Sequence, residues 1–190
     1  MPLTALDPNT ALIVIDLQKG IVNGNFIHPI REVIDRTRTL IDVFRAQNLP
    51  VVLVNVAGRA PGRTEQGPRM IASLPEGWTD LLPQLDQQPG DLVVTKRSWG
   101  AFPTTDLEEQ LKARGVTQVV VTGVVTSTGV EATARQAYEQ GFNVTLAVDA
   151  MTDLNKEAHD YSIRNVFPRL GETGSTQEII SLLKQRTSTR

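Results

Sequence analysis

The 190-residue sequence contains no cysteine, which excludes disulfide bonds, thiolate metal ligands and thiol nucleophiles. It has no apolar run approaching the roughly 20 residues that a membrane span needs, and residues 1–10 lack the basic and apolar stretches of a secretory signal. The net charge of -2 gives no indication of binding to nucleic acid or to an anionic membrane. These absences predict a cytoplasmic protein that binds a small-molecule substrate and neither nucleic acid nor a membrane.

Length and composition are those of one globular domain, which we predict to span residues 1–190. Hydrophobic residues make up 40% of the chain and charged residues 21%, as is usual for a protein with an apolar core. A chain of this length buries roughly 70% of its unfolded surface, so its core can be stable without covalent cross-links.

Short apolar runs rich in valine and isoleucine recur along the chain. They do not alternate with polar residues, which is typical of strands that are covered on both faces of a parallel sheet. The predicted strands are residues 11–16, 51–56, 92–95, 119–122 and 143–148.

Helical patterns separate these runs. Gly115 follows the predicted helix of residues 107–114 and Gly141 that of residues 130–140, and both glycines are expected to form left-handed helix ends. Strand and helix in alternation favour right-handed crossovers, so we predict an α/β protein. It would be a three-layer α/β/α sandwich with a Rossmann-like, mostly parallel sheet of about six strands. The predicted helices are residues 30–47, 107–114, 130–140 and 176–184.

Residues 57–90 form a long segment rich in glycine, proline and arginine. We expect it to cross the carboxyl edge of the sheet with room for a short helical turn, because long loops in compact domains are usually functional. Arg59, Arg63 and Arg69 could bind a carboxylate from this segment. Solvated loop residues are the alternative for each of them.

Three places at the carboxyl ends of predicted strands can carry chemistry, because ligands of open parallel sheets bind there. Asp16 ends the first strand, where burial would raise its pKa and suit it to acid–base work. Lys96 follows the third strand and could orient Asp16 by its charge. The small residues of 122–131 would let a ligand approach the backbone. A turn aspartate, a solvated lysine and a packing motif are the respective alternatives.

These places, in this order, resemble the isochorismatase-like hydrolases of the cysteine hydrolase superfamily, which include nicotinamidases, carbamoylsarcosine hydrolases and isochorismatases. The resemblance covers nearly the whole chain and is weakest over residues 57–90. The segments that carry it are residues 11–18, 96–102, 123–135, 148–153 and 166–171.

The resemblance implies a catalytic set at Asp16, Lys96 and Gly129. In amide-cleaving members the third position is a cysteine, but glycine has no side chain and forms no thioacyl intermediate. Two subgroups carry glycine there. Isochorismatases hydrolyse a vinyl ether with a proton and water; the other subgroup is poorly characterised, and its Gly-Val-Glu-Ser-Thr-Ala-Arg-like string is closer to residues 129–135 of this chain.

The resemblance also implies a cis peptide between Val124 and Val125, with the amides of Val125 and Gly129 facing an anionic ligand. Nicotinamidases bind a divalent ion with an aspartate and histidines. His28 and His159 are the only histidines here, and neither lies in an Asp-x-His arrangement, so we predict no metal and no cofactor. We interpret His28 as a surface or capping residue and His159 as a packed one. A homo-oligomer, either dimer or tetramer, is expected from the resemblance.

Further candidates for substrate binding surround these positions. Ser127 and Thr128 could cap a helix, bind substrate or attack a carbonyl. Gln18 would be a polar neighbour of Asp16 or face solvent. Trp99, Phe102 and Phe26 could form a wall of the pocket, or they could lie in the core or at a subunit contact. Arg59 of the long segment is a further candidate, and Glu131 could pair with Arg135.

Together these features predict a hydrolase of a small, anionic metabolite in which Asp16 is a general acid or base and Lys96 tunes its charge. Hydrolysis of a vinyl ether would require a protonated Asp16. Two alternatives remain open at this point: a binding protein that has lost the chemistry, and an amidase that uses Ser127 or Thr128.

Overall fold

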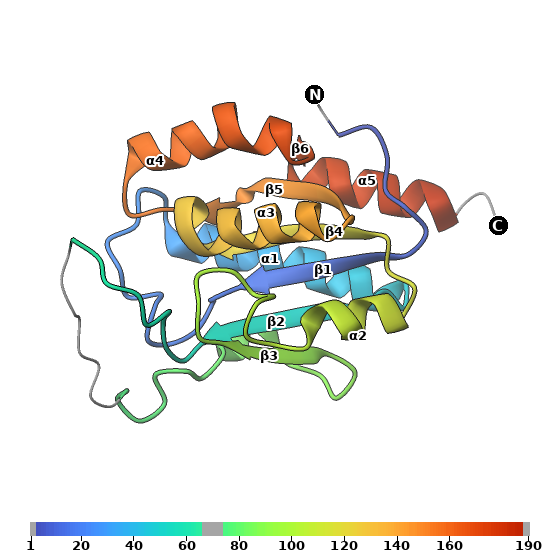
Figure 1. Cartoon of the computed structure of the whole chain (residues 1–190). Coiled ribbons are helices and arrows are strands. Elements are labelled where there is room, and N and C mark those ends of the chain that lie inside the picture. Colours follow the sequence, from blue (N-terminus) through green and yellow to red (C-terminus); the bar gives the residue numbers. More distant parts are fainter. Residues whose placement is uncertain (1–2, 66–73, 188–190) are drawn as a thin grey trace.

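The computed structural model describes residues 3–65 and 74–187, and a parallel six-stranded sheet forms its centre (Figure 1). The strands lie in the order β3-β2-β1-β4-β5-β6, and every neighbouring pair is parallel. This confirms the predicted α/β sheet. The strands are β1 (Thr10–Ile15), β2 (Val51–Val56), β3 (Leu92–Lys96), β4 (Gln118–Val124), β5 (Asn143–Thr152) and β6 (Glu172–Gly174). The sequence pattern missed β6, because its three residues form no apolar run.

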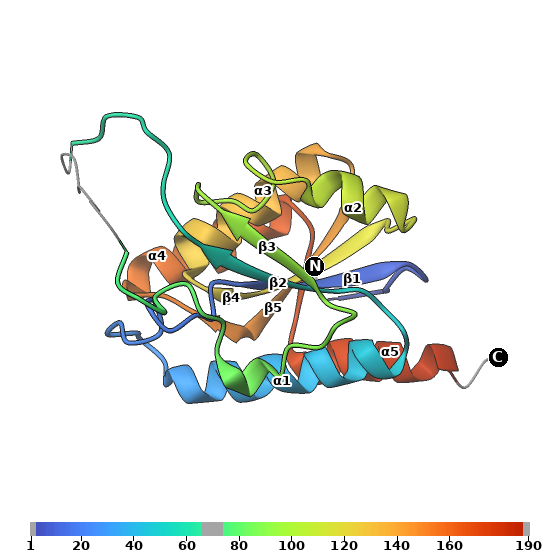
Figure 2. The same ribbon diagram turned by 90° about the horizontal axis from the view of Figure 1, so that it is seen from below.

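Helices cover both faces of the sheet and confirm the three-layer sandwich. Figure 2 shows α1 and α5 side by side on one face, with α2 and α3 on the other. No helix in the described part of the chain has the length and apolar character to cross a bilayer. The helices are α1 (Ile30–Ala46), α2 (Leu107–Ala113), α3 (Glu131–Glu139), α4 (Lys156–Tyr161) and α5 (Thr176–Thr187).

The helix ends follow the local sequence. Gly115 and Gly141 have φ of 68° and 85°, which confirms the predicted left-handed ends of α2 and α3. The start of α3 differs from the prediction: residues 126–130 form a π-helical turn, and the α-helix begins only at Glu131. That wider turn lies directly after β4. Turns of this kind often occur at functional sites.

The long segment after β2 returns to the sheet beside β1. Leu81 forms an isolated antiparallel bridge with Gln18, and Pro83–Leu85 form a single 3-10 turn. The turn confirms the predicted short helical piece. Arg69 lies outside the described residues.

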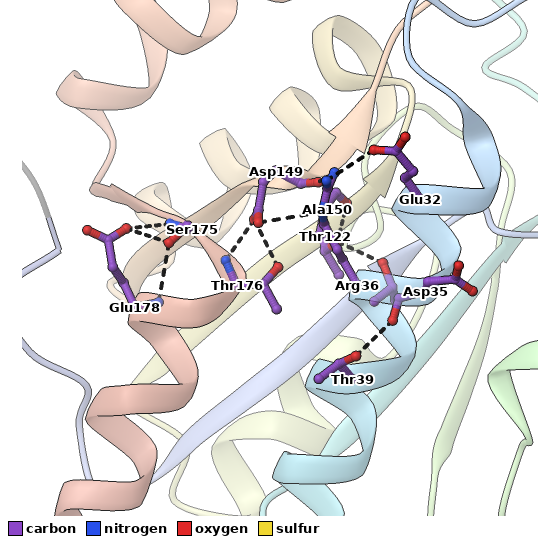
Figure 3. A network of polar contacts seen from close by, with 11 residues as sticks. Glu32, Asp35, Arg36, Thr39, Thr122, Asp149, Ala150, Ser175, Thr176 and Glu178 are labelled. Atoms are coloured by element: carbon purple, nitrogen blue, oxygen red, sulfur yellow. Dashed lines mark hydrogen bonds and ion pairs between the residues drawn. The ribbon is translucent and has the colours of Figure 1, made fainter.

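A bulge in β5 redirects the end of that strand. The pairing with β4 jumps from Val121–Leu146 to Gly123–Met151, so several residues of β5 have no partner in register. Figure 3 shows what holds them: the Thr122 hydroxyl donates to Ala150 O, and the Arg36 guanidinium of α1 donates to Asp149 O. The carboxylate of Asp149 also accepts the amide and hydroxyl of Thr176, at 2.7 and 2.9 Å, and so fixes the start of α5.

Gly123 lets β4 approach β1 closely near their carboxyl ends. Its φ is 112°, and a Cβ atom added there would lie only 2.1 Å from Ile15 O. Both features exclude a side chain.

Gly123→Ala should therefore lower the free energy of unfolding by about 2–4 kcal/mol, because it adds both a backbone clash and an unfavourable φ. Gly90→Ala is the control, since a Cβ there meets nothing within 4 Å; it should change stability by less than about 0.5 kcal/mol. Urea unfolding of both variants measures the difference, and equal effects would contradict this view of the β1–β4 contact.

Candidate active site

Asp16 follows β1 at the point where the strand order reverses. β1 pairs with β2 on one side and with β4 on the other, and this reversal is where open α/β sheets bind ligands. The residue has φ of 53°, and its amide donates to Val54 O of β2. The left-handed backbone turns the chain away from the sheet directly after the strand.

The carboxylate of Asp16 forms a buried ion pair with Lys96. The Nζ–Oδ2 distance is 2.8 Å, and the two side chains are only 9% and 2% exposed. Because β2 lies between β1 and β3, the long lysine side chain spans a strand to reach Asp16. Lys96 Nζ also donates to Ser98 O at 3.1 Å. The alternative of a solvated lysine is therefore wrong.

The other oxygen of the carboxylate, Asp16 Oδ1, is buried and has no hydrogen-bond partner among the described residues. Burial raises the pKa of Asp16 from 3.8 to about 6, although the charge and hydrogen bond of Lys96 act in the opposite direction. About a tenth of the Asp16 carboxyl groups are protonated at pH 7 with such a pKa. The group can thus both hold and release a proton near neutral pH.

The chain turns after β4 at residues 124–130, which we call the backbone corner, and this corner faces the Asp16 carboxylate. The Val124–Val125 peptide is cis, as the resemblance implied. The amides of Thr128 and Val130 donate to Val125 O, which closes the π-turn. A Cβ atom placed on Gly129 would lie 3.3 Å from Asp16 Oδ2, so the corner touches the acid through backbone alone.

The sequence comparison with known proteins identifies the family. Residues 10–178 match the isochorismatase domain model. The chain belongs to the isochorismatase family.

Individual relatives agree with this assignment. The chain is 40% identical to the isochorismatase family protein YecD of Escherichia coli O157:H7 over 92% of this chain and 96% of that protein. It is 31% identical to Nicotinamidase 3 of Arabidopsis thaliana over 84% of this chain and 83% of that protein. The solved structure of an isochorismatase family protein from Burkholderia thailandensis has a TM-score of 0.90 at 37% identity, covering 95% and 98% of the two chains. The family is one of hydrolases.

Thr133 of α3 links the corner to the loop that follows Lys96 and β3 in this isochorismatase-family fold. The Thr133 hydroxyl donates to Gly129 O at 2.7 Å and accepts the Ala101 amide at 3.2 Å, and it is fully buried. The Gln136 side chain lies against Gly100 one turn further on. Sequence reasoning missed Thr133, although a threonine one helical turn after a glycine corner is a usable signal.

The two histidines lie on the other side of the corner. His159 is buried and its Nδ1 lies 2.9 Å from the Thr126 hydroxyl, which confirms a packed role. Burial lowers the pKa of His159, and the neighbouring His28 lowers it further. His28 is exposed before α1, with its ring edge-on to His159 at 4.9 Å, as expected for a surface residue. Within the described residues, no group of three or more histidines and carboxylates could hold a metal.

Gln18 is completely buried, so a solvent-facing position is wrong. Its amide nitrogen donates to Val56 O and Trp78 O, and its oxygen accepts the Val56 amide. The Trp78 ring in turn covers Gly20. Gln18 thereby fastens the long segment to β2 beside Asp16.

The remaining candidates are spread over the carboxyl edge and the core. Phe102 is buried and stacks on Phe142 at 6.1 Å, so it is a core residue. Trp99 is 65% exposed, Phe26 lies half-buried at the edge of the core on the α1 side, and Arg59 is exposed on the long segment. Substrate contact by these three residues stays a prediction. Glu131 pairs with Arg135 at 2.9 Å, as expected from their spacing, and Glu131 also accepts the Ser162 hydroxyl.

The raised pKa of Asp16 has a measurable effect on stability. A carboxyl group whose folded pKa is above its unfolded value contributes stability below about pH 4 and loses it as the pH rises through about 6. The unfolding free energy of Asp16→Asn, relative to the natural chain, should therefore rise by about 2.5 kcal/mol between pH 4 and pH 7.5. Denaturant unfolding at both pH values checks this. A relative change in the opposite direction would mean that Lys96 lowers the pKa of Asp16 below its ordinary value.

Proposed function

We propose that this chain hydrolyses a small, anionic metabolite, with Asp16 as the proton donor, Lys96 as its partner and Gly129 in place of a nucleophilic cysteine. The observation that carries the proposal is the buried Asp16 carboxyl group, ion-paired to Lys96 and 3.3 Å from the Cβ position of Gly129.

The absence of a side chain at Gly129 leaves proton transfer and water as the available chemistry. No thiol exists in the chain, so no thioacyl intermediate can form. Lys96 holds Asp16 Oδ2, whereas Oδ1 is unpartnered and buried. Oδ1 is thus the oxygen that would donate a proton to the carbon of a vinyl ether. Water would then add to the resulting oxocarbenium ion and return a proton to Asp16, and the hemiketal formed would break its C–O bond to release the two products.

Lys96 sets how readily that proton is released. Its ammonium group favours the ionised carboxylate, while burial favours the protonated form. A proton donor needs a pKa near the working pH, and the balance of these two effects supplies it. The substrate's own negative charge would lie at the amides of Val125 and Gly129, beside the hydroxyls of Ser127 and Thr128.

A hydroxyl nucleophile has weaker support than an acid. The buried imidazole of His159 is hydrogen-bonded to Thr126 and not to Ser127 or Thr128. A serine or threonine nucleophile requires a base within hydrogen-bond reach. The subunit number and the contact with Arg59 stay predictions from the resemblance and the sequence.

The direct test is a turnover screen against isochorismate, nicotinamide and simple amides. Asp16→Asn should reduce kcat/KM for the accepted substrate by roughly 100-fold or more, because it removes the proton donor. Asp91→Asn is a matched control, since Asp91 is another buried carboxylate, paired with Arg45 at the start of β3 and so at the opposite edge of the sheet. It should leave kcat/KM unchanged. Full activity of Asp16→Asn would contradict the proposed role of Asp16 as proton donor.

The pH dependence distinguishes a proton donor from a base. An acid with a pKa of about 6 gives a kcat/KM that falls as the pH rises through 6, and a base gives the reverse. Lys96→Met should move the falling limb to higher pH, because the ammonium group lowers the pKa of Asp16. Initial rates between pH 4.5 and 9 measure both effects. A limb that rises through pH 6, or one that Lys96→Met leaves in place, contradicts the assignment.

Gly129→Cys should introduce hydrolysis of nicotinamide or a simple amide at a rate at least tenfold above the natural chain, because its thiol would lie beside Asp16. The chain has no other cysteine, so iodoacetamide labelling followed by mass spectrometry shows whether the new thiol is accessible. Gly129→Cys combined with Asp16→Asn is the control and should lose the gain. A folded, labelled variant without any amide hydrolysis would contradict the proposed correspondence of Gly129 with the catalytic cysteine.

A further inference from the structure

Asp153 carries a buried carboxylate that the proposed chemistry does not use. The residue is only 2% exposed and directly follows β5. Its Oδ2 accepts the Ser127 amide at 2.7 Å, and its Oδ1 accepts the Asn155 amide at 3.0 Å. No lysine or arginine among the described residues pairs with it. A buried carboxylate with only backbone donors costs free energy, so its position must be held by the surrounding fold.

The Ser127 amide belongs to the backbone corner that faces Asp16. It lies two residues after Val125 and two before Gly129, within the π-turn. The corner is thus anchored at two points from different elements. Thr133 of α3 holds Gly129 O, and Asp153 holds the amide of Ser127.

His159 adds a second contact from the same segment as Asp153. Its Nδ1 lies 2.9 Å from the Thr126 hydroxyl, next to the Ser127 amide. Asn155 accepts the Ala158 amide and begins α4, which brings His159 to the corner. Figure 1 shows the connection from β5 to α4 passing beside the start of α3. We refer to Asp153–His159 as the clamp segment.

The bulge in β5 explains why the clamp segment reaches the corner. Thr122 and Arg36 hold the bulged residues from the α1 side (Figure 3), and β5 then pairs again with β4 up to Val124–Thr152. Asp153 therefore leaves the sheet beside the cis peptide. Residues 148–153 carry part of the family resemblance, but the sequence analysis gave Asp153 no role of its own.

We propose that Asp153 is a positioning residue that, through the Ser127 amide and supported by His159, holds the backbone corner against Asp16. Asp153 itself touches no substrate. This inference rests on the proposed function for its activity readout, but the position of the corner can be measured without any substrate.

The experiment compares Asp153→Ala, Asp153→Asn and Asp149→Ala in the full chain by two measurements. The first is the carbon-13 NMR titration of the Asp16 carboxyl group, whose signal is assigned with Asp16→Asn. The second is kcat/KM. Asp153→Ala should let the corner move and water reach Asp16, which lowers the Asp16 titration midpoint by roughly one pH unit. It should also lower kcat/KM by roughly 30- to 100-fold, because a small misplacement of a site is costly.

Two controls separate position from charge and from general stability. Asp153→Asn loses the charge and the acceptor of the Asn155 amide but keeps an acceptor oxygen for the Ser127 amide, so both readouts should stay close to those of the natural chain. Asp149→Ala removes a carboxylate of β5 that holds the start of α5 and lies between α1 and α5 (Figure 3). It should lower the Tm and move neither readout.

The outcomes test the positioning role of Asp153 and the proposed function independently of each other. An unmoved Asp16 midpoint in Asp153→Ala overturns the positioning role, and so does an equal change in Asp153→Asn, which would indicate charge alone. If the midpoint moves as expected while Asp16→Asn stays fully active, the positioning role stands and the proposed function fails. If Asp153→Ala does not fold, His159→Phe removes the supporting contact and should move the midpoint in the same direction.

Discussion

The carboxylate of Asp16 and the ammonium group of Lys96 are buried together, and the geometry of the site depends on this ion pair. Removing two charges from water is costly, and their attraction offsets the cost only when both are held in good geometry. The fold provides that geometry because β1 and β3 are rigid strands on either side of β2. Burial and charge act on the Asp16 pKa in opposite directions, which leaves it near neutrality.

The second requirement is a backbone corner that comes close to the acid without a side chain. Gly123 permits β4 to approach Ile15, and Gly129 places bare backbone next to Asp16 Oδ2. Side chains from two other elements, Thr133 and Asp153, then hydrogen-bond the corner's own carbonyl and amide groups. The proposed proton transfer relies on such placement, since electrostatic and proton-transfer effects fall off quickly with displacement.

Sequence patterns predicted most of the fold because they report burial on both faces of a strand. Five strands were found from valine-rich runs, and α1 was placed to within one residue. β6 escaped because three residues carry too little periodicity. The π-turn before α3 escaped because hydrophobic periodicity does not distinguish its hydrogen bonds to Val125 O from those of an α-helix. The same limit applies to Gln18, whose polar side chain is buried by the returning loop and not by its own neighbours.

The sequence by itself determined which chemistry is available: it contains no thiol, it places an acid at the end of an apolar strand and a lysine after another, and it puts glycine at the corner. These are properties of residue identity and local pattern. Only the tertiary structure decided that Lys96 reaches across β2 to Asp16, and that Asp153 rather than another carboxylate holds the corner. Such contacts join segments far apart in the chain, so they depend on strand order and on the bulge in β5, which no local pattern encodes.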